Sequence, residues 1–156
     1  MSVGRTSERS PAMTDNVTAT ASANESGAVL AAAADWALRA AFAGVFVFHG
    51  VSKFMNLEGG AQMMGQPVLI WALVAFAELA GGVGLLAGRA IPGSIGDAVT
   101  RLSGAAVVPV MLGAIAMVHW GRWNFAPSES HPMGGMEFQV VLLAIGLFYA
   151  LRGNRA

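Results

Sequence analysis

Five ionisable residues in the apolar part of this sequence could bind a polar ligand or move protons: His49, Lys53, Glu78, His119 and Glu137. Histidine and lysine side chains donate hydrogen bonds, and carboxyl and imidazole groups act as proton acceptors and donors. Ionisable residues within membrane spans are costly to bury and mark a functional site by default. Whether these five can act together depends on the elements that position them.

The composition indicates a membrane protein. Of the 156 residues, 55% are hydrophobic and 12% are charged, whereas soluble domains carry about 25% charged residues. Nine basic residues balance nine acidic ones, and no basic cluster offers a surface for nucleic acid, so we expect no nucleic-acid partner. The absence of cysteine excludes disulfides, thiolate metal sites, iron–sulfur clusters and covalently attached haem.

Four stretches approach the about 20 apolar residues that cross about 30 Å of hydrocarbon as a helix. The fold class predicted is all-α: a polytopic membrane protein with a four-transmembrane-helix bundle and a disordered N-terminal tail. The membrane domain covers residues 36–153, and its spans are residues 36–54, 68–88, 102–120 and 135–152. Arg39 and Lys53 lie near the ends of the first span, from which long side chains can snorkel to the interface.

Residues 1–35 are rich in Ser, Thr, Ala and Asn and hold few large apolar side chains. Such a segment buries too little surface to offset its ordering entropy, which predicts a disordered tail. The tail does not resemble a secretory signal, because its charged start is followed by polar residues and its first apolar stretch, AVLAAAAD, is mostly alanine. Its start, at Met1 or at Met13, stays open.

Basic residues near the spans favour cytoplasmic N- and C-termini in the cell membrane. This orientation places most of the basic residues of the membrane domain inside and two outside: Arg39, Arg89, Arg101, Arg152 and Arg155 against Lys53 and Arg122. The polar ends of the first, third and fourth spans then all lie at the external face. Glu78 lies about 15 Å along the second span from its external end, so the five residues converge on the outer half of the bundle.

Glu78 is the single charge of the second span. At 100° per residue it shares a helical stripe with both large and very small residues: Trp71, Val74, Ala75, Gly81, Gly82 and Leu85. Small residues let another helix approach closely, so this stripe should face the bundle. A carboxyl group there is either protonated or paired with Lys53 or a protonated histidine.

Each of the five residues also has a structural interpretation. Glu78 can hold helices together through a hydrogen bond, and His49 can be a neutral imidazole bound to a carboxylate. Lys53 and His119 can be interfacial anchors, and the helix macrodipole favours Glu137 at a helix N-terminus.

Two cofactor alternatives also involve these histidines. A haem held by His49 and His119 would require the two imidazoles to face each other. External methionines with His119 and His131 could offer soft ligands to Cu(I), although flexible packing accounts for methionines in loops more simply. We therefore predict no metal site.

The order of these motifs resembles the DoxX family of small four-helix membrane proteins over residues 36–153. The resemblance rests on an apolar helix that closes in His-Gly-x-x-Lys, then Glu-x-x-Gly-Gly, a helix-terminal His and a Glu that opens the last helix. The matching segments are LRAAFAGVFVFHGVSKF (38–54), AELAGGVGLLAGR (77–89), GAIAMVHW (113–120) and GGMEFQVVLLAIGLFYALRG (134–153).

The resemblance implies redox work in the bacterial cytoplasmic membrane, in some members with quinone reduction. The first hypothesis is a membrane oxidoreductase subunit in which Glu78, His49, His119 and Glu137 are the catalytic cluster. His49, Lys53 and His119 would bind a quinone-like group, and the carboxyl groups would relay protons. The alternative is a non-enzymatic scaffold or anchor for a soluble redox or oxidative-stress partner. A small transporter is a third class, and it would need a homo-oligomer.

Overall fold

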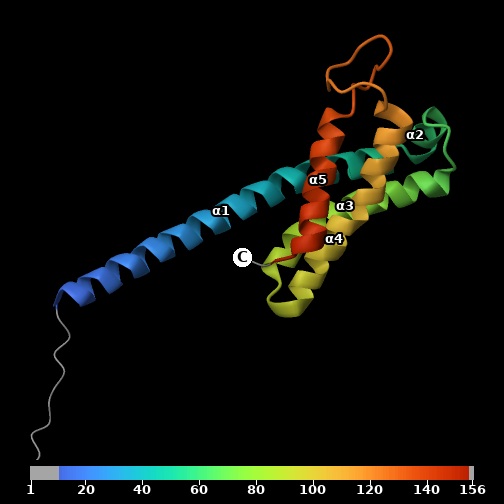
Figure 1. The fold of residues 1–156 in the computed structure, drawn as a ribbon. Helices are drawn as coiled ribbons and strands as arrows, with labels where there is room; N and C mark the ends of the chain where they lie inside the picture. The colour runs from blue at the N-terminus through green and yellow to red at the C-terminus, as the bar shows by residue number, and fades with distance from the viewer. Residues whose placement is uncertain (1–10, 155–156) are drawn as a thin grey trace, which may run out of the picture. The chain divides into compact units, whose positions relative to one another are not determined.

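The computed structural model describes residues 11–154, and within that range all regular structure is helical. In chain order the elements are α1 (Pro11–Met55), α2 (Leu57–Met63), α3 (Val68–Ala90), α4 (Gly93–Ala114), the π-helical turn η1 (Ile115–His119) and α5 (Glu137–Arg152) (Figure 1). The chain divides into two units between Ala37 and Leu38. Everything said below about packing and sites concerns the second unit.

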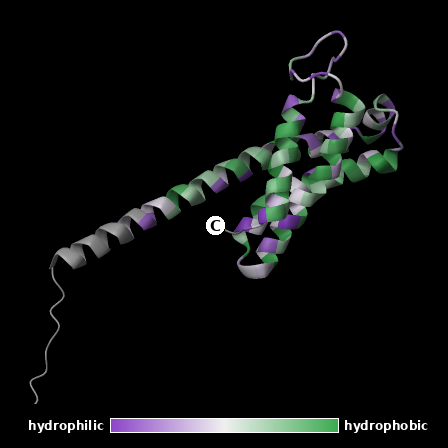
Figure 2. Ribbon diagram, viewed as in Figure 1, coloured by the Kyte–Doolittle hydropathy of each residue, from purple (hydrophilic) through white to green (hydrophobic). Residues whose placement is uncertain are grey.

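Three helical segments within the described residues are long and apolar enough to cross a membrane: Asn24–Met55, Val68–Ala90 and Gly93–His119. Helix α5 has 16 residues and extends about 24 Å, a little less than the hydrocarbon core, a mismatch that a bilayer can absorb by thinning. Hydrophobic residues follow α3, α4 and α5 along their lengths (Figure 2). The chain is an all-α, multi-pass membrane protein, as its composition predicts.

The first helix begins earlier than the span expected from Trp36, because α1 is continuous from Pro11. The sequence between these two residues is rich in alanine, the residue with the highest helix propensity. That residues 1–35 form a disordered tail stays a prediction. Residues 1–10 of the predicted tail lie outside the described part of the chain.

Helices α1, α3, α4 and α5 pack through small residues around an apolar core. A Cβ added at Gly82 would lie 3.1 Å from the carbonyl oxygen of Ala43, and one at Gly104 would lie 2.6 Å from that of Gly146. These glycines therefore let backbones meet. The core is formed by Phe42, Phe46, Leu85, Val107, Met111, Leu142 and Tyr149. The predicted stripe is confirmed, since Ala75, Glu78, Gly81, Gly82 and Leu85 are all buried.

Arg39 is fully buried, so the prediction that it snorkels to the interface is wrong. Its Nη1 donates to the carbonyl oxygen of Leu85 at 2.7 Å and to Thr100 Oγ1 at 3.2 Å. Its Nη2 donates to Asn154 Oδ1 at 2.9 Å, and the guanidinium lies 4.5 Å from the centroid of the Tyr149 ring. These partners replace water, because a guanidinium presents five donors and also stacks on aromatic faces.

The residues around Arg39 hold together the end of the bundle at which α5 ends. Asn154 Nδ2 donates to the carbonyl oxygen of Gly88 at 2.6 Å, and the Asn154 backbone N–H donates to Asp97 Oδ1 at 2.7 Å. Arg101 pairs with Asp97 at 2.7 Å and donates to the carbonyl oxygens of Leu151 and Arg152, at the end of α5. We call Arg39, Asp97, Thr100, Arg101 and Asn154 the Arg39 network.

Candidate functional site

Lys53 and Glu78 form an ion pair in the membrane region. Lys53 lies in the last turn of α1 and Glu78 lies midway along α3. Lys53 Nζ is 2.9 Å from Glu78 Oε1 and 2.7 Å from Oε2, and the exposed fractions of the side chains are 16% and 4%. Of the states expected for Glu78, the structure therefore shows the pairing with Lys53. The ammonium also lies 5.3 Å from the centroid of the Trp71 ring, within cation–π range.

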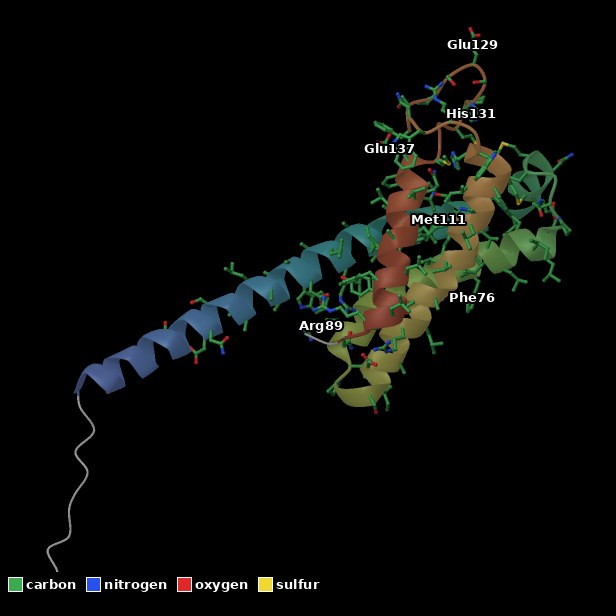
Figure 3. The ribbon with its side chains drawn as sticks, in the orientation of Figure 1. Phe76, Arg89, Met111, Glu129, His131 and Glu137 are labelled. Carbon is green, nitrogen blue, oxygen red and sulfur yellow. The ribbon has the colours of Figure 1, made fainter. Side chains whose placement is uncertain are left out.

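The ion pair borders a cavity of about 240 Å³ between α1, α3, α4, η1 and α5. Most of its walls are apolar, and four methionines contribute: Met64, Met111, Met117 and Met133. Figure 3 places Met111 on α4, among the packed helices. The polar lining of the cavity consists of seven side chains: His49, Lys53, Gln66, Trp71, Glu78, His119 and Gln139. The indole N–H of Trp71 is buried and has no hydrogen-bond partner within the described residues. An apolar cavity with a few convergent polar groups is the usual form of a small-molecule site.

His49 lines this cavity from α1, one turn before Lys53. Its side chain is exposed, and its ring meets that of Phe48 edge-on at 5.5 Å. Among the described residues no hydrogen-bond partner of the imidazole is found. Both ring nitrogens are therefore open to a ligand at the cavity edge.

His119 is the last residue of η1 and is 7% exposed. Its Nδ1 donates to the carbonyl oxygen of Gly134 at 2.8 Å, and its Nε2 lies 3.0 Å from Gln139 Nε2. A carbonyl oxygen can only accept, so Nδ1 carries the proton and the lone pair of Nε2 accepts from the Gln139 amide. Both nitrogens are thus engaged, which argues against the iron ligation considered from the sequence.

Glu137 is not among the residues that line this cavity. One of its carboxylate oxygens accepts the backbone N–H of Phe125 at 3.2 Å, at the start of α5. Backbone hydrogen bonds from Gly135 to Asn124 and from Met136 to Arg122 hold this loop together. The side chain therefore ties the loop to the helix start, where Figure 3 shows it, rather than facing Glu78.

The remaining histidine belongs to the same loop. His131 Nε2 donates to the carbonyl oxygen of Trp120 at 2.9 Å, and Ser130 Oγ lies 3.1 Å from its Nδ1. Figure 3 shows His131 and Glu129 on the loop that projects beyond α5. No group of three or more His, Asp or Glu side chains that could hold a metal ion occurs within residues 11–154.

Four of the five candidates therefore meet at one cavity: His49, Lys53, Glu78 and His119. Sequence reasoning missed Gln139, which joins His119 to the cavity wall. One signal was available, because Gln139 is the single uncharged amide side chain in α5. The contact itself joins residues that are 20 positions apart, and no local pattern shows such a contact.

Fold and site together define a multi-pass helical membrane protein with a polar cavity between its helices. Residues 34–120 match the DoxX family, and the chain belongs to that family. It is similar to "Putative oxidoreductase CatD" of Bacillus subtilis (strain 168), with 33% identity over 114 residues, which cover 71% of this chain and 72% of that protein. No solved structure matches the chain significantly.

Proposed function

We propose that the chain is a subunit of a membrane oxidoreductase and that its cavity binds the head group of a one-ring quinone. The observation that carries the proposal is the meeting of the Lys53–Glu78 ion pair and the unpartnered His49 at one apolar cavity. The relative named as an oxidoreductase supports the redox assignment.

The size and lining of the cavity fit such a head group. Its volume of about 240 Å³ lies below the about 300–1,000 Å³ typical of pockets for drug-sized ligands, which favours one ring over haem or a flavin. Methionine side chains adapt their shape and make favourable contacts between sulfur and aromatic rings. Met111 and Met117, on α4 and η1, can thus contact the faces of a planar ring.

The polar residues divide into donors and a proton-exchanging group. A quinone supplies two-electron chemistry coupled to the uptake of two protons. Lys53 Nζ donates to both carboxylate oxygens of Glu78. An ammonium group has three N–H donors, so one remains for a ligand. His49 provides a second donor at the cavity edge. Glu78 accepts from Lys53 and can hold or release a proton beside the ligand, while His119 orients Gln139 rather than binding the ligand itself.

The proposal includes an orientation. We propose that both termini are cytoplasmic and that the cavity opens toward the external half of the membrane, because the basic residues near the spans favour that arrangement. The native chain has no cysteine, so single cysteines report on sidedness without background. In intact cells, a membrane-impermeant maleimide should label Ser130→Cys, in the loop before α5, and should leave Ser94→Cys, at the start of α4, unlabelled. The reverse pattern would overturn the orientation.

Measuring quinone binding to the purified protein tests the proposed function directly. The protein is purified in mild detergent, its bound lipids are extracted and identified, and a short-chain benzoquinone is titrated by calorimetry. Wild-type protein should bind the quinone, and Glu78→Gln and Lys53→Met should weaken binding at least about tenfold, as expected for loss of a charge-assisted contact. Glu137→Gln is the matched control, because that carboxylate lies outside the cavity. Wild-type protein that binds no quinone would favour the scaffold for a soluble partner instead.

A further inference from the structure

Gln139 has a hydrogen-bonding capacity that its neighbours do not use. Its Oε1 atom is buried and has no hydrogen-bond partner within the part of the chain that the structure describes, while its side chain lines the cavity. An amide oxygen without a donor is costly in a membrane interior. The Oε1 atom has almost no accessible surface of its own, so a ligand in the cavity supplies its donor once the amide turns toward the cavity.

The direction of each hydrogen bond around His119 determines which atom of Gln139 is free. The carbonyl oxygen of Gly134 accepts from Nδ1, so the lone pair of the ring is on Nε2. That lone pair requires the amide group of Gln139 to present its N–H, at 3.0 Å. The oxygen of the amide is then the atom left over, and it can only accept. The Gly134 carbonyl oxygen thus determines, through the tautomer of His119, that Gln139 has a free acceptor and not a free donor.

We propose that Gln139 makes the cavity selective for the reduced, dihydroxy form of the quinone, an inference that rests on the proposed function. A ring hydroxyl can donate to Gln139 Oε1, whereas the carbonyl oxygen of the oxidised form cannot. A site built to pair with a hydroxyl rejects an analogue that lacks one, because the buried polar atom of the site is left unpaired. Lys53 can only donate, so it binds either form without this discrimination, and His49 can donate to either form through its ring N–H.

Calorimetry with two forms of one compound tests the inference. A decyl-substituted benzoquinone and its reduced form, kept under argon, are titrated into purified full-length protein. Wild-type protein should bind the reduced form about five- to tenfold more tightly, the worth of one hydrogen bond. Gln139→Met should lower that ratio, because it removes one of the acceptors that a ring hydroxyl can reach. Gln62→Met is the matched control, because Gln62 is exposed on α2 and is not among the residues that line the cavity, and it should keep the ratio.

The outcomes separate this inference from the proposed function. Equal affinity of wild-type protein for both forms, or an unchanged ratio in Gln139→Met, would overturn the role of Gln139 and leave the quinone site standing. If neither form binds, both proposals fail. Should Gln139→Met not fold, the dimethyl ether of the reduced compound replaces the variant, since it keeps the ring and removes the hydroxyl donors. Wild-type protein should bind the ether more weakly than the dihydroxy form, and equal binding would again overturn the inference.

Discussion

The Arg39 network and the Glu78–Lys53 pair are two ways of burying charge in the same bundle. Arg39 is enclosed, and carbonyl, hydroxyl and amide oxygens accept from its guanidinium. Glu78 and Lys53 satisfy each other beside a cavity, with the unpartnered His49 and Gln139 Oε1 nearby. Spare hydrogen-bonding capacity distinguishes the two regions. Buried polar groups that are fully paired with protein fix a structure, whereas those with capacity left beside a cavity can bind a ligand.

The largest effect should come from Arg39→Ala. The change removes a buried cation together with its hydrogen bonds to the Leu85 carbonyl oxygen, Thr100 Oγ1 and Asn154 Oδ1, and it leaves an unfilled space in the bundle, so we expect a loss of about 3 kcal/mol or more in the free energy of unfolding. Unfolding with sodium dodecyl sulfate measures this loss. Arg152→Ala is the matched control, because Arg152 is exposed at the end of α5. Equal stability of the two variants would remove the distinction between the regions.

Glu78→Gln should have the next largest effect on stability, about 2 kcal/mol, because it leaves the mostly buried Lys53 ammonium without its counter-charge. The double variant Lys53→Gln with Glu78→Gln should recover most of that loss, since neither charge is then unpaired. Quinone binding should stay weak in both. Recovery of binding together with stability would show that the pair serves folding alone. The same denaturation series and the calorimetric titration supply the two measurements.

Asn154→Ala should cost about 1–2 kcal/mol of stability, because it removes an acceptor for Arg39 and a donor to Gly88 while the rest of the network remains. Combined with Arg39→Ala, its effect should be less than additive, since both residues share one hydrogen bond. Quinone affinity at the other end of the bundle should be unchanged. A strong loss of affinity on this substitution would mean that the two regions are energetically coupled.

The smallest effect should come from Glu137→Gln. A glutamine oxygen can still accept the backbone N–H of Phe125, so the expected change in stability is about 0.5 kcal/mol or less. Quinone affinity should match that of wild-type protein within error. If Glu137→Gln lowered quinone affinity as much as Glu78→Gln does, Glu137 would belong to the binding site, as the sequence suggested.

Sequence and structure agree where a local pattern carries the information. The stripe around Glu78 could be predicted because helical periodicity alone decides which residues share a face. The location of Lys53 at a helix end, four residues after His49, follows from the same regularity. Glu137 was grouped with these residues because it opens the last helix, yet its direction depends on how the loop before it folds back through Asn124 and Arg122.

Arg39 shows why the other assignments could not be made from the sequence. A residue near the predicted end of a span can either snorkel or find internal partners, and the partners of Arg39 come from residues 46, 61 and 115 positions away. Gln139 presents the same problem, since its free oxygen follows from the tautomer of His119. Hydrogen bonds between distant segments leave no periodic trace in the sequence.

The sequence by itself determined that this chain is a helical membrane protein of the DoxX family with few charges in its spans. Hydropathy and periodicity are local properties, and they suffice for that conclusion. The tertiary structure alone decided that Glu78 pairs with Lys53, that Arg39 is buried and that Glu137 faces the loop. Those outcomes depend on which polar groups the packed helices bring within hydrogen-bonding distance, because a buried charge in a membrane takes whichever partners packing provides.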